Sequence, residues 1–133
     1  MKRTITISFA LFCLMLAGGA TLPSGRSGAA VRVESAVVEF AETVKLRDAL
    51  LRGEYLVVHD EEKMANGLPC TYIYSGKHRI DEKLITAFHC IHADRSAVSS
   101  FTVSFLRPTS AYGVPEITEI QFAGSTDGHI VPR

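Results

Sequence analysis

The sequence lacks an excess of charge of either sign. It contains 14 Lys and Arg residues and 14 Asp and Glu residues. Loss of Lys2 and Arg3 with an N-terminal segment would leave 12 basic against 14 acidic residues. Proteins that bind nucleic acid or anionic membranes through long-range attraction carry a basic patch or stripe. The charge balance therefore gives no reason to expect either partner.

The motifs of thiol redox and haem chemistry are also missing. The sequence has no CxxC and no CxxCH, the spacings of dithiol oxidoreductases and of covalent haem attachment. Cys70 lies in the turn sequence GLPC, without a helix N-terminus that would lower its pKa. We therefore expect no catalytic thiol.

Hydrolase and calcium-loop motifs are absent as well. There is no G-x-S-x-G elbow, in which the nucleophile of many hydrolases sits. Ser125, Asp127 and His129 are the residue types of a triad, but they lie in one GSTDGH segment, whereas triad members converge from separate segments. We expect them to hydrogen-bond their own turn. The acidic run 60–62 lacks the alternating spacing of a calcium loop and predicts a solvated loop, so no enzyme is predicted.

The N-terminus is typical of a secretory signal peptide. Lys2 and Arg3 precede an apolar run at residues 5–17 and small residues at 18–20. The apolar run is too short to span a bilayer comfortably, and no second run of membrane length follows. We expect cleavage after Ala20, or alternatively after Ala30, and a periplasmic or secreted protein with no membrane span in the mature chain. The predicted organisation is a signal peptide at 1–20, a flexible leader at 21–32 and a single β domain at 33–133.

Short runs of β-branched and aromatic residues dominate the remaining chain, which indicates strands. Candidate strands lie at residues 31–40, 43–46, 54–60, 70–75, 83–92, 100–108 and 116–124. Turn residues separate them, among others Arg52 with Gly53, and the GSTDGH segment. This pattern predicts an all-β fold, a small antiparallel β-sandwich or open barrel. Residues 35–51 also fit helical spacing, so a helix is the alternative there.

Removal of Cys13 with the signal peptide would leave two cysteines, Cys70 and Cys90, in an exported protein. A hairpin that places Cys70 opposite Cys90 also places Tyr72 opposite Phe88. It sends Ile73, Ile85, Ala87 and Ile91 to an aliphatic core face. Directly opposed residues are close enough for a disulfide, and disulfides persist outside the cytoplasm. A Cys70–Cys90 disulfide is therefore the main prediction, and a slip of one residue would separate the two cysteines.

A metal site is the alternative interpretation of the same segment. Cys90 and His92 would share a face with Cys70 opposite them, and His59 would join if its strand lies alongside. These four residues match the ligand sets of Zn or Cu. His89 points the other way in this arrangement. No cofactor is otherwise expected.

Tyr55, Tyr72 and Tyr74 are the candidates for an aromatic ligand surface, since Tyr72 and Tyr74 share a face of the predicted hairpin. Partly buried tyrosines with hydroxyls at the rim of the core are the alternative. If both rings are exposed, a peptide or a glycan would be a suitable ligand.

The segments ALLRGEYLVVHD, FHC and EITEIQFAGSTDGHIVP resemble a group of small secreted β-domain proteins of unknown function from acidobacteria and related soil bacteria. In that group an L-P-A-G-x-Y-x-V turn joins two strands. Here Gly53 and Tyr55 match the turn, while Leu51 and Arg52 depart from its Pro and Ala. The resemblance spans roughly residues 38–132. It implies a signal peptide followed by a β domain and no catalytic residue.

Taken together, the sequence predicts an exported, non-catalytic β domain. We expect a binding or structural module of the cell envelope, with a protein, peptide or glycan partner that the residues do not specify. The alternative is an exported protein that binds Zn or Cu through His59, Cys70, Cys90 and His92.

Overall fold

The computed structural model describes residues 31–133. The expected signal peptide, both expected cleavage positions and the leader up to residue 30 lie outside these residues. The first strand begins at Val33.

Strands make up most of the described chain. They are β1 (Val33–Leu46), β2 (Ala49–Asp60), β3 (Thr71–Ser75), β4 (Leu84–Phe88), β5 (Ile91–Asp94), β6 (Thr102–Leu106), β7 (Glu116–Gln121) and β8 (Asp127–Ile130). One short helix, α1 (Glu61–Ala65), and one 3-10 turn, η1 (Asp81–Lys83), interrupt them. The expected all-β fold is confirmed.

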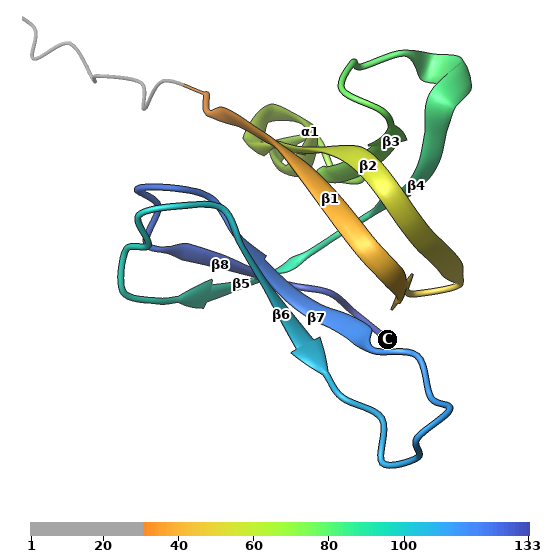
Figure 1. Cartoon of the computed structure of the whole chain (residues 1–133). Helices are drawn as coiled ribbons and strands as arrows, with labels where there is room; N and C mark the ends of the chain where they lie inside the picture. Colours follow the sequence, from red (N-terminus) through yellow and green to blue (C-terminus); the bar gives the residue numbers. More distant parts are fainter. Residues whose placement is uncertain (1–30) are drawn as a thin grey trace, which may run out of the picture.

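The strands form one curled sheet that resembles half of a barrel (Figure 1). Their order is β4-β3-β2-β1-β7-β8-β5, and β6 pairs with β7 on the side. We call β1–β4 the first half-sheet and β5–β8 the second half-sheet. Strand pairing between the two halves is limited to one parallel position, Lys45 with Glu116, whereas the other strand pairs are antiparallel. The sheet is therefore mixed, and the halves face each other across its curl.

The segment for which a helix was the alternative forms the long β1–β2 hairpin. The turn expected at Arg52 and Gly53 is wrong, because both residues lie inside β2. Gly53 has a φ of 92° and sits where the strand register shifts between Phe40 and Val44. Glycine adopts this backbone conformation at little cost, which suits a bulge. The chain reverses instead between Leu46 and Ala49.

Residues 83–92, expected to form one strand, form two strands that belong to different half-sheets. β4 ends at Phe88 on the edge of the first half-sheet, and β5 begins at Ile91 on the edge of the second. His89 and Cys90 form the crossover between them. The GSTDGH segment, expected to be a turn, contains the start of β8. β8 pairs with β5 and β7, so its partners come from other parts of the chain.

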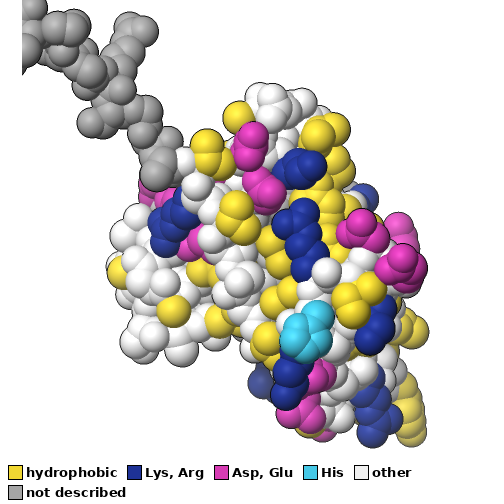
Figure 2. Space-filling view, turned by 90° about the horizontal axis from the view of Figure 1, so that it is seen from above, with side chains coloured by type: hydrophobic (Ala, Val, Ile, Leu, Met, Phe, Trp, Pro, Cys, Tyr) yellow, Lys and Arg dark blue, Asp and Glu magenta, His cyan; other side chains and the backbone are white. Residues whose placement is uncertain are grey.

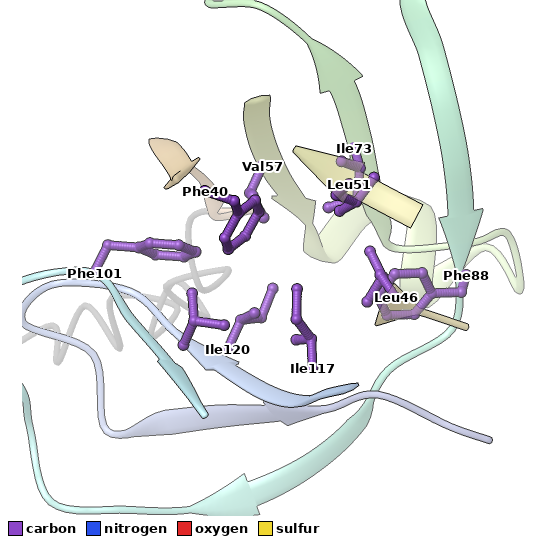
Figure 3. A pocket seen from close by; sticks show the side chains of 10 residues that line it. Phe40, Leu46, Leu51, Val57, Ile73, Phe88, Phe101, Ile117 and Ile120 are labelled. Atoms are coloured by element: carbon purple, nitrogen blue, oxygen red, sulfur yellow. The ribbon is translucent and has the colours of Figure 1, made fainter. Parts of the chain in front are cut away.

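Apolar side chains fill the space between the half-sheets. Figure 3 shows Phe40, Leu51 and Val57 from the first half-sheet directed towards Ile117 and Ile120 from the second. Only about 10 Å³ of free volume remains among these side chains, which is about enough for one water molecule. The interior between the half-sheets is thus a packed core.

Part of the expected aliphatic face is solvent-exposed. Ile73 is buried as expected, but Ile85 and Ile91 are 44% and 55% exposed. The register explains the difference: Thr71 pairs with Phe88, one residue away from the expected pairing of Cys70 with Cys90. Phe88 consequently enters the core instead.

The surface shows no gathering of one type of charge on the face seen in Figure 2, where acidic, basic and hydrophobic side chains are interspersed. Among residues 31–133, neither helix has the length and apolar composition needed to cross a bilayer.

Two adjacent leucines test the packing of the half-sheets. Leu51 is 1% exposed and Leu50 is 65% exposed. We expect Leu51→Ala to lower the free energy of unfolding by about 2–5 kcal/mol, because it leaves a cavity in the core. Leu50→Ala, the matched control, should change it by less than about 0.5 kcal/mol. Urea unfolding measures both, and equal effects of the two substitutions would contradict the described core.

Candidate functional site

The two cysteines meet at the crossover between the half-sheets. Cys70 precedes β3 and is held on both sides: its N–H donates to the Phe88 carbonyl at 3.1 Å, and its carbonyl accepts from the Asp60 N–H at 2.8 Å. Cys90 follows β4, and its N–H donates to Cys70 Sγ at 3.3 Å. The expected register was wrong by one residue, yet the thiols meet because the chain leaves β4 after Phe88 and turns towards Cys70.

The sulfur atoms of Cys70 and Cys90 lie 3.1 Å apart. A disulfide bond is about 2.05 Å long, so the structure describes two free thiols in contact. The Cys70–Cys90 disulfide stays a prediction.

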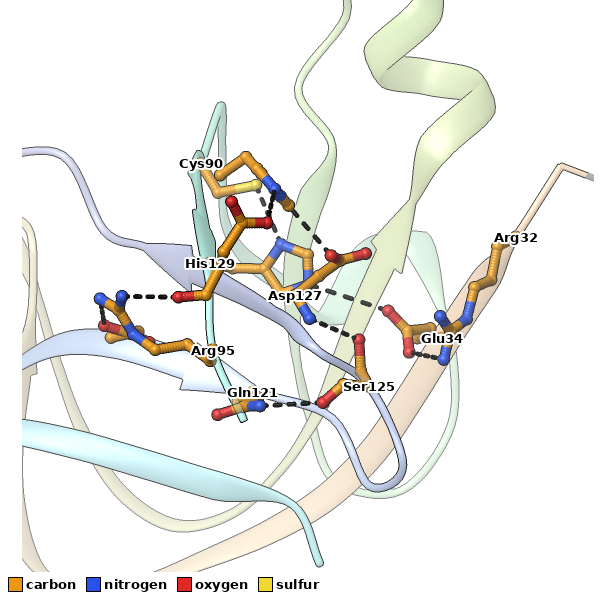
Figure 4. Close-up of polar contacts among 11 residues, drawn as sticks. Arg32, Glu34, Cys90, Arg95, Gln121, Ser125, Asp127 and His129 are labelled. Carbon is orange, nitrogen blue, oxygen red and sulfur yellow. Dashed lines mark hydrogen bonds and ion pairs between the residues drawn. The ribbon is translucent and has the colours of Figure 1, made fainter. Parts of the chain in front are cut away.

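Two buried histidines stand beside the thiols. His59, near the end of β2, and His129, in β8, are 2% and 4% exposed. Their ring centroids are 4.0 Å apart, so they pack across the gap between the half-sheets. Cys90 Sγ lies 3.5 Å from His129 Nδ1, as Figure 4 shows. We call His59, Cys70, Cys90 and His129 the Cys–His cluster.

The Cys–His cluster has the composition of a metal site. His59, Cys90 and His129 each offer one ligand atom, and these three atoms all lie within 4.8 Å of one another. Cys70 lies outside this group of three and is joined to it by the 3.1 Å contact with Cys90. Two thiols and two imidazoles are a common zinc-binding set.

Two polar atoms of the cluster have no hydrogen-bond partner. They are His59 Nδ1 and His129 Nε2, both buried. Buried polar atoms without a partner are uncommon in proteins, because each has lost its hydration. His59 Nδ1 therefore has an unmet capacity for binding, whereas His129 Nε2 lies 3.8 Å from the carboxylate of Glu34.

Burial keeps both imidazoles neutral. It lowers the pKa of His129 to about 4, and the adjacent His59 lowers it further. Burial also lowers the pKa of His59, against the opposing effect of Asp60. The neutral imidazole is the form that binds metals.

The thiol of Cys90 is a poor nucleophile in this environment. Burial raises its pKa to about 12, and the hydrogen bond with Cys70 adds to the effect. Reactive cysteines have lowered pKa values, so this geometry does not resemble a thiol enzyme. A metal ion would have to replace the thiol proton.

A carboxylate stands behind His129. Glu34 Oε2 is 3.8 Å from His129 Nε2, and its other oxygen pairs with Arg32 at 2.6 Å. Because His129 is neutral at pH 7, the 3.8 Å contact is not an ion pair there. We assign the proton to Nε2, where it faces Glu34, and this leaves the Nδ1 lone pair facing Cys90. Metal-binding histidines commonly have a carboxylate on the second nitrogen in this way.

His92 lies outside the Cys–His cluster, although it was expected to be one of the metal ligands. His92 lies opposite His129 in the β5–β8 pairing, but its side chain is 56% exposed and contacts Asp94 at 3.2 Å and Asp127 at 3.8 Å. These three residues form a separate surface group. His129 takes the position expected for His92, because β8 pairs with β5.

The other segments with candidate chemistry have structural contacts. Ser125 Oγ accepts from the Asp127 N–H at 3.1 Å, the local hydrogen bond expected of this segment. Asp60 caps α1 by accepting from the Lys63 N–H at 3.2 Å. The acidic run is thus the start of a short helix, which was expected to be a loop.

The two tyrosines differ in exposure. Tyr74 is 2% exposed and packs with Leu56 and Val58, while Tyr72 is half-buried. Their rings stack with centroids 6.4 Å apart, and the Arg79 guanidinium lies 5.9 Å from the Tyr72 centroid. Only Tyr72 offers a partly accessible ring for the predicted peptide or glycan surface.

Comparison with known proteins found no matching family model, curated protein or solved structure. The resemblance to the secreted soil-bacterial proteins therefore stays a prediction.

The buried imidazole of His129 makes stability depend on pH. In the unfolded chain it titrates near pH 6.5, and in the folded protein near pH 4. Between these values the unfolded state binds more protons, so the free energy of unfolding falls as the pH is lowered from 6.5 to 4. We expect this residue to account for a loss on the order of 2–3 kcal/mol.

Urea unfolding of the metal-free protein at several pH values measures this dependence. His129→Gln should reduce it, with the buried His59 accounting for what remains, and His92→Gln, the exposed control, should retain most of it. A wild-type slope in His129→Gln would contradict the burial of a neutral His129.

Proposed function

We propose that the protein binds a transition-metal ion, Zn²⁺ or Cu⁺, through His59, Cys70, Cys90 and His129. The observation that carries the proposal is a pair of buried imidazoles that, together with Cys90, offer three ligand atoms within 4.8 Å of one another, beside a second thiol in contact with Cys90. The signal-like N-terminus supports the further proposal that the protein is exported, and we propose that its role is binding and not catalysis.

The two distances that involve Cys90 Sγ require little rearrangement. Two thiolates on one tetrahedral Zn²⁺ lie about 3.8 Å apart, and a thiolate lies about 3.6 Å from an imidazole nitrogen. The corresponding distances are 3.1 Å for Cys70 Sγ to Cys90 Sγ and 3.5 Å for Cys90 Sγ to His129 Nδ1. Cys90, on the crossover, is the residue that can move to open the pair.

Charge favours Zn²⁺ over Cu⁺. Two thiolates and two neutral imidazoles around Zn²⁺ form a centre with no net charge, whereas the same ligands around Cu⁺ leave one negative charge. Burial of an uncompensated charge is costly. The nearby Glu34 is already paired with Arg32, and further negative charge next to it would be unfavourable.

A structural β module is the second candidate function. It is supported by the 3.1 Å contact of the two sulfurs, since oxidation of the pair would close a loop between Cys70 and Cys90. Such a cross-link stabilises a protein by on the order of 3 kcal/mol for a loop of this length. The module would then act in the envelope through a protein, peptide or glycan partner.

Cobalt binding tests the metal proposal. We expect the reduced protein to bind one Co²⁺ with sulfur-to-cobalt charge-transfer bands and the visible spectrum of a tetrahedral ion. Cys90→Ser and His129→Gln should each weaken binding by more than about 100-fold, since even loss of an outer partner costs about 10–100-fold. His92→Gln should bind like the wild type, because His92 lies outside the cluster.

Two outcomes would contradict this assignment. Loss of binding in His92→Gln with retention in His129→Gln would move the site to the surface group. Absence of cobalt binding by fully reduced, folded protein would leave the structural module as the proposed function.

A further inference from the structure

We infer that metal binding is controlled by the redox state of the Cys70–Cys90 pair: the dithiol holds the ion, and the disulfide releases it. This inference rests on the proposed metal site and names its regulation. It follows because the same two sulfur atoms would bond either to the metal ion or to each other, and these two states exclude each other.

The sulfurs cannot serve both roles at once. A disulfide sulfur has no thiolate charge to donate to the metal. Cys70 and Cys90 are the only cysteines in residues 31–133, so no other described thiol can replace them. Oxidation would leave His59 and His129, two of four ligands.

The observed distance between the two sulfur atoms lies between the distances expected for the disulfide and for two zinc-bound thiolates. The sulfurs are 3.1 Å apart, compared with about 2.05 Å in a disulfide and about 3.8 Å on a tetrahedral zinc ion. The distance between the two sulfur atoms therefore differs from that of either state by about 1 Å or less.

The two cysteines differ in freedom and access. Cys70 is fully buried and fixed by backbone hydrogen bonds to Asp60 and Phe88. Cys90 is half-buried, lies on the crossover between two edge strands and contacts Cys70 through both its N–H and its sulfur. Cys90 is thus the residue that meets an external oxidant, while Cys70 completes the reaction from a fixed position.

The chemistry balances with a small organic disulfide, RSSR, as the oxidant. The Cys90 thiolate, the form present once the ion has replaced the thiol proton, attacks RSSR, forming a Cys90–SR mixed disulfide and releasing RS⁻, which takes up a proton to give one RSH. The Cys70 sulfur then attacks Cys90 Sγ, breaking the bond to the second SR group, which leaves as RSH. For the zinc form, the two thiolates, RSSR and two protons give the protein disulfide, two RSH and free Zn²⁺. The cysteine sulfurs are oxidised and the RSSR sulfurs are reduced.

The test uses the full folded domain with zinc and hydroxyethyl disulfide. Zinc affinity is measured by competition with a chromogenic chelator, for the reduced protein under anaerobic conditions and for the oxidised protein. We expect more than a 100-fold lower affinity after oxidation, and release of one zinc ion per disulfide formed. Mass spectrometry after thiol alkylation counts the disulfides, and circular dichroism monitors the fold.

Two variants separate the contribution of the histidine ligand from that of the cysteine pair. His129→Gln should still form the disulfide but bind zinc weakly in both redox states. Cys90→Ser should form no internal disulfide, and its weak zinc binding should not respond to the oxidant.

The failures are distinguishable. If the reduced protein does not bind zinc, the metal site itself is wrong. If the reduced protein binds zinc but the disulfide form binds it within threefold, or if the oxidant forms no Cys70–Cys90 disulfide, only the redox control is wrong.

Discussion

The apolar contact between the two half-sheets is the constraint on which the rest of the structure depends. Backbone strand pairing joins the halves at the single position Lys45 with Glu116. Side chains such as Leu51 and Ile120 must therefore hold them together, and their close packing leaves almost no free volume. This contact brings the end of β2 against β8, and so places His59 on His129. The Cys–His cluster exists because the curl of the sheet closes there.

In the metal-free protein, the Cys–His cluster lowers the stability of the fold that brings its residues together. Burial lowers the pKa of both imidazoles and leaves His59 Nδ1 and His129 Nε2 without a partner. These are costs in the metal-free protein. Metal coordination at His59 and at His129 Nδ1 would offset these costs, because an ion that binds only the folded state stabilises it. Ligands from both half-sheets would then also link the halves at the edge where they share no strand pairing.

The sequence predicted the strand-rich class because runs such as EYLVVHD and CTYIYS carry β-branched and aromatic residues whose local preference agrees with the fold. It also predicted that Cys70 and Cys90 meet, although through the wrong register. His129 was missed as a ligand because β8 is a short strand within a turn-like, Gly-containing segment, and its partners β5 and β7 are chosen by tertiary packing. Gly53 led to a different error, the prediction of a turn inside a strand. A glycine within a β-bulge and a glycine that ends a strand look the same in the sequence.

X-ray absorption at the zinc edge tests the central claim most directly, because it reports the atoms bound to the ion. For the reduced, zinc-loaded protein we predict two sulfur neighbours at about 2.3 Å and two nitrogen neighbours at about 2.0–2.1 Å. This result would place the ion among His59, Cys70, Cys90 and His129. A shell made only of nitrogen and oxygen, as the surface group of His92, Asp94 and Asp127 would supply, would contradict the claim.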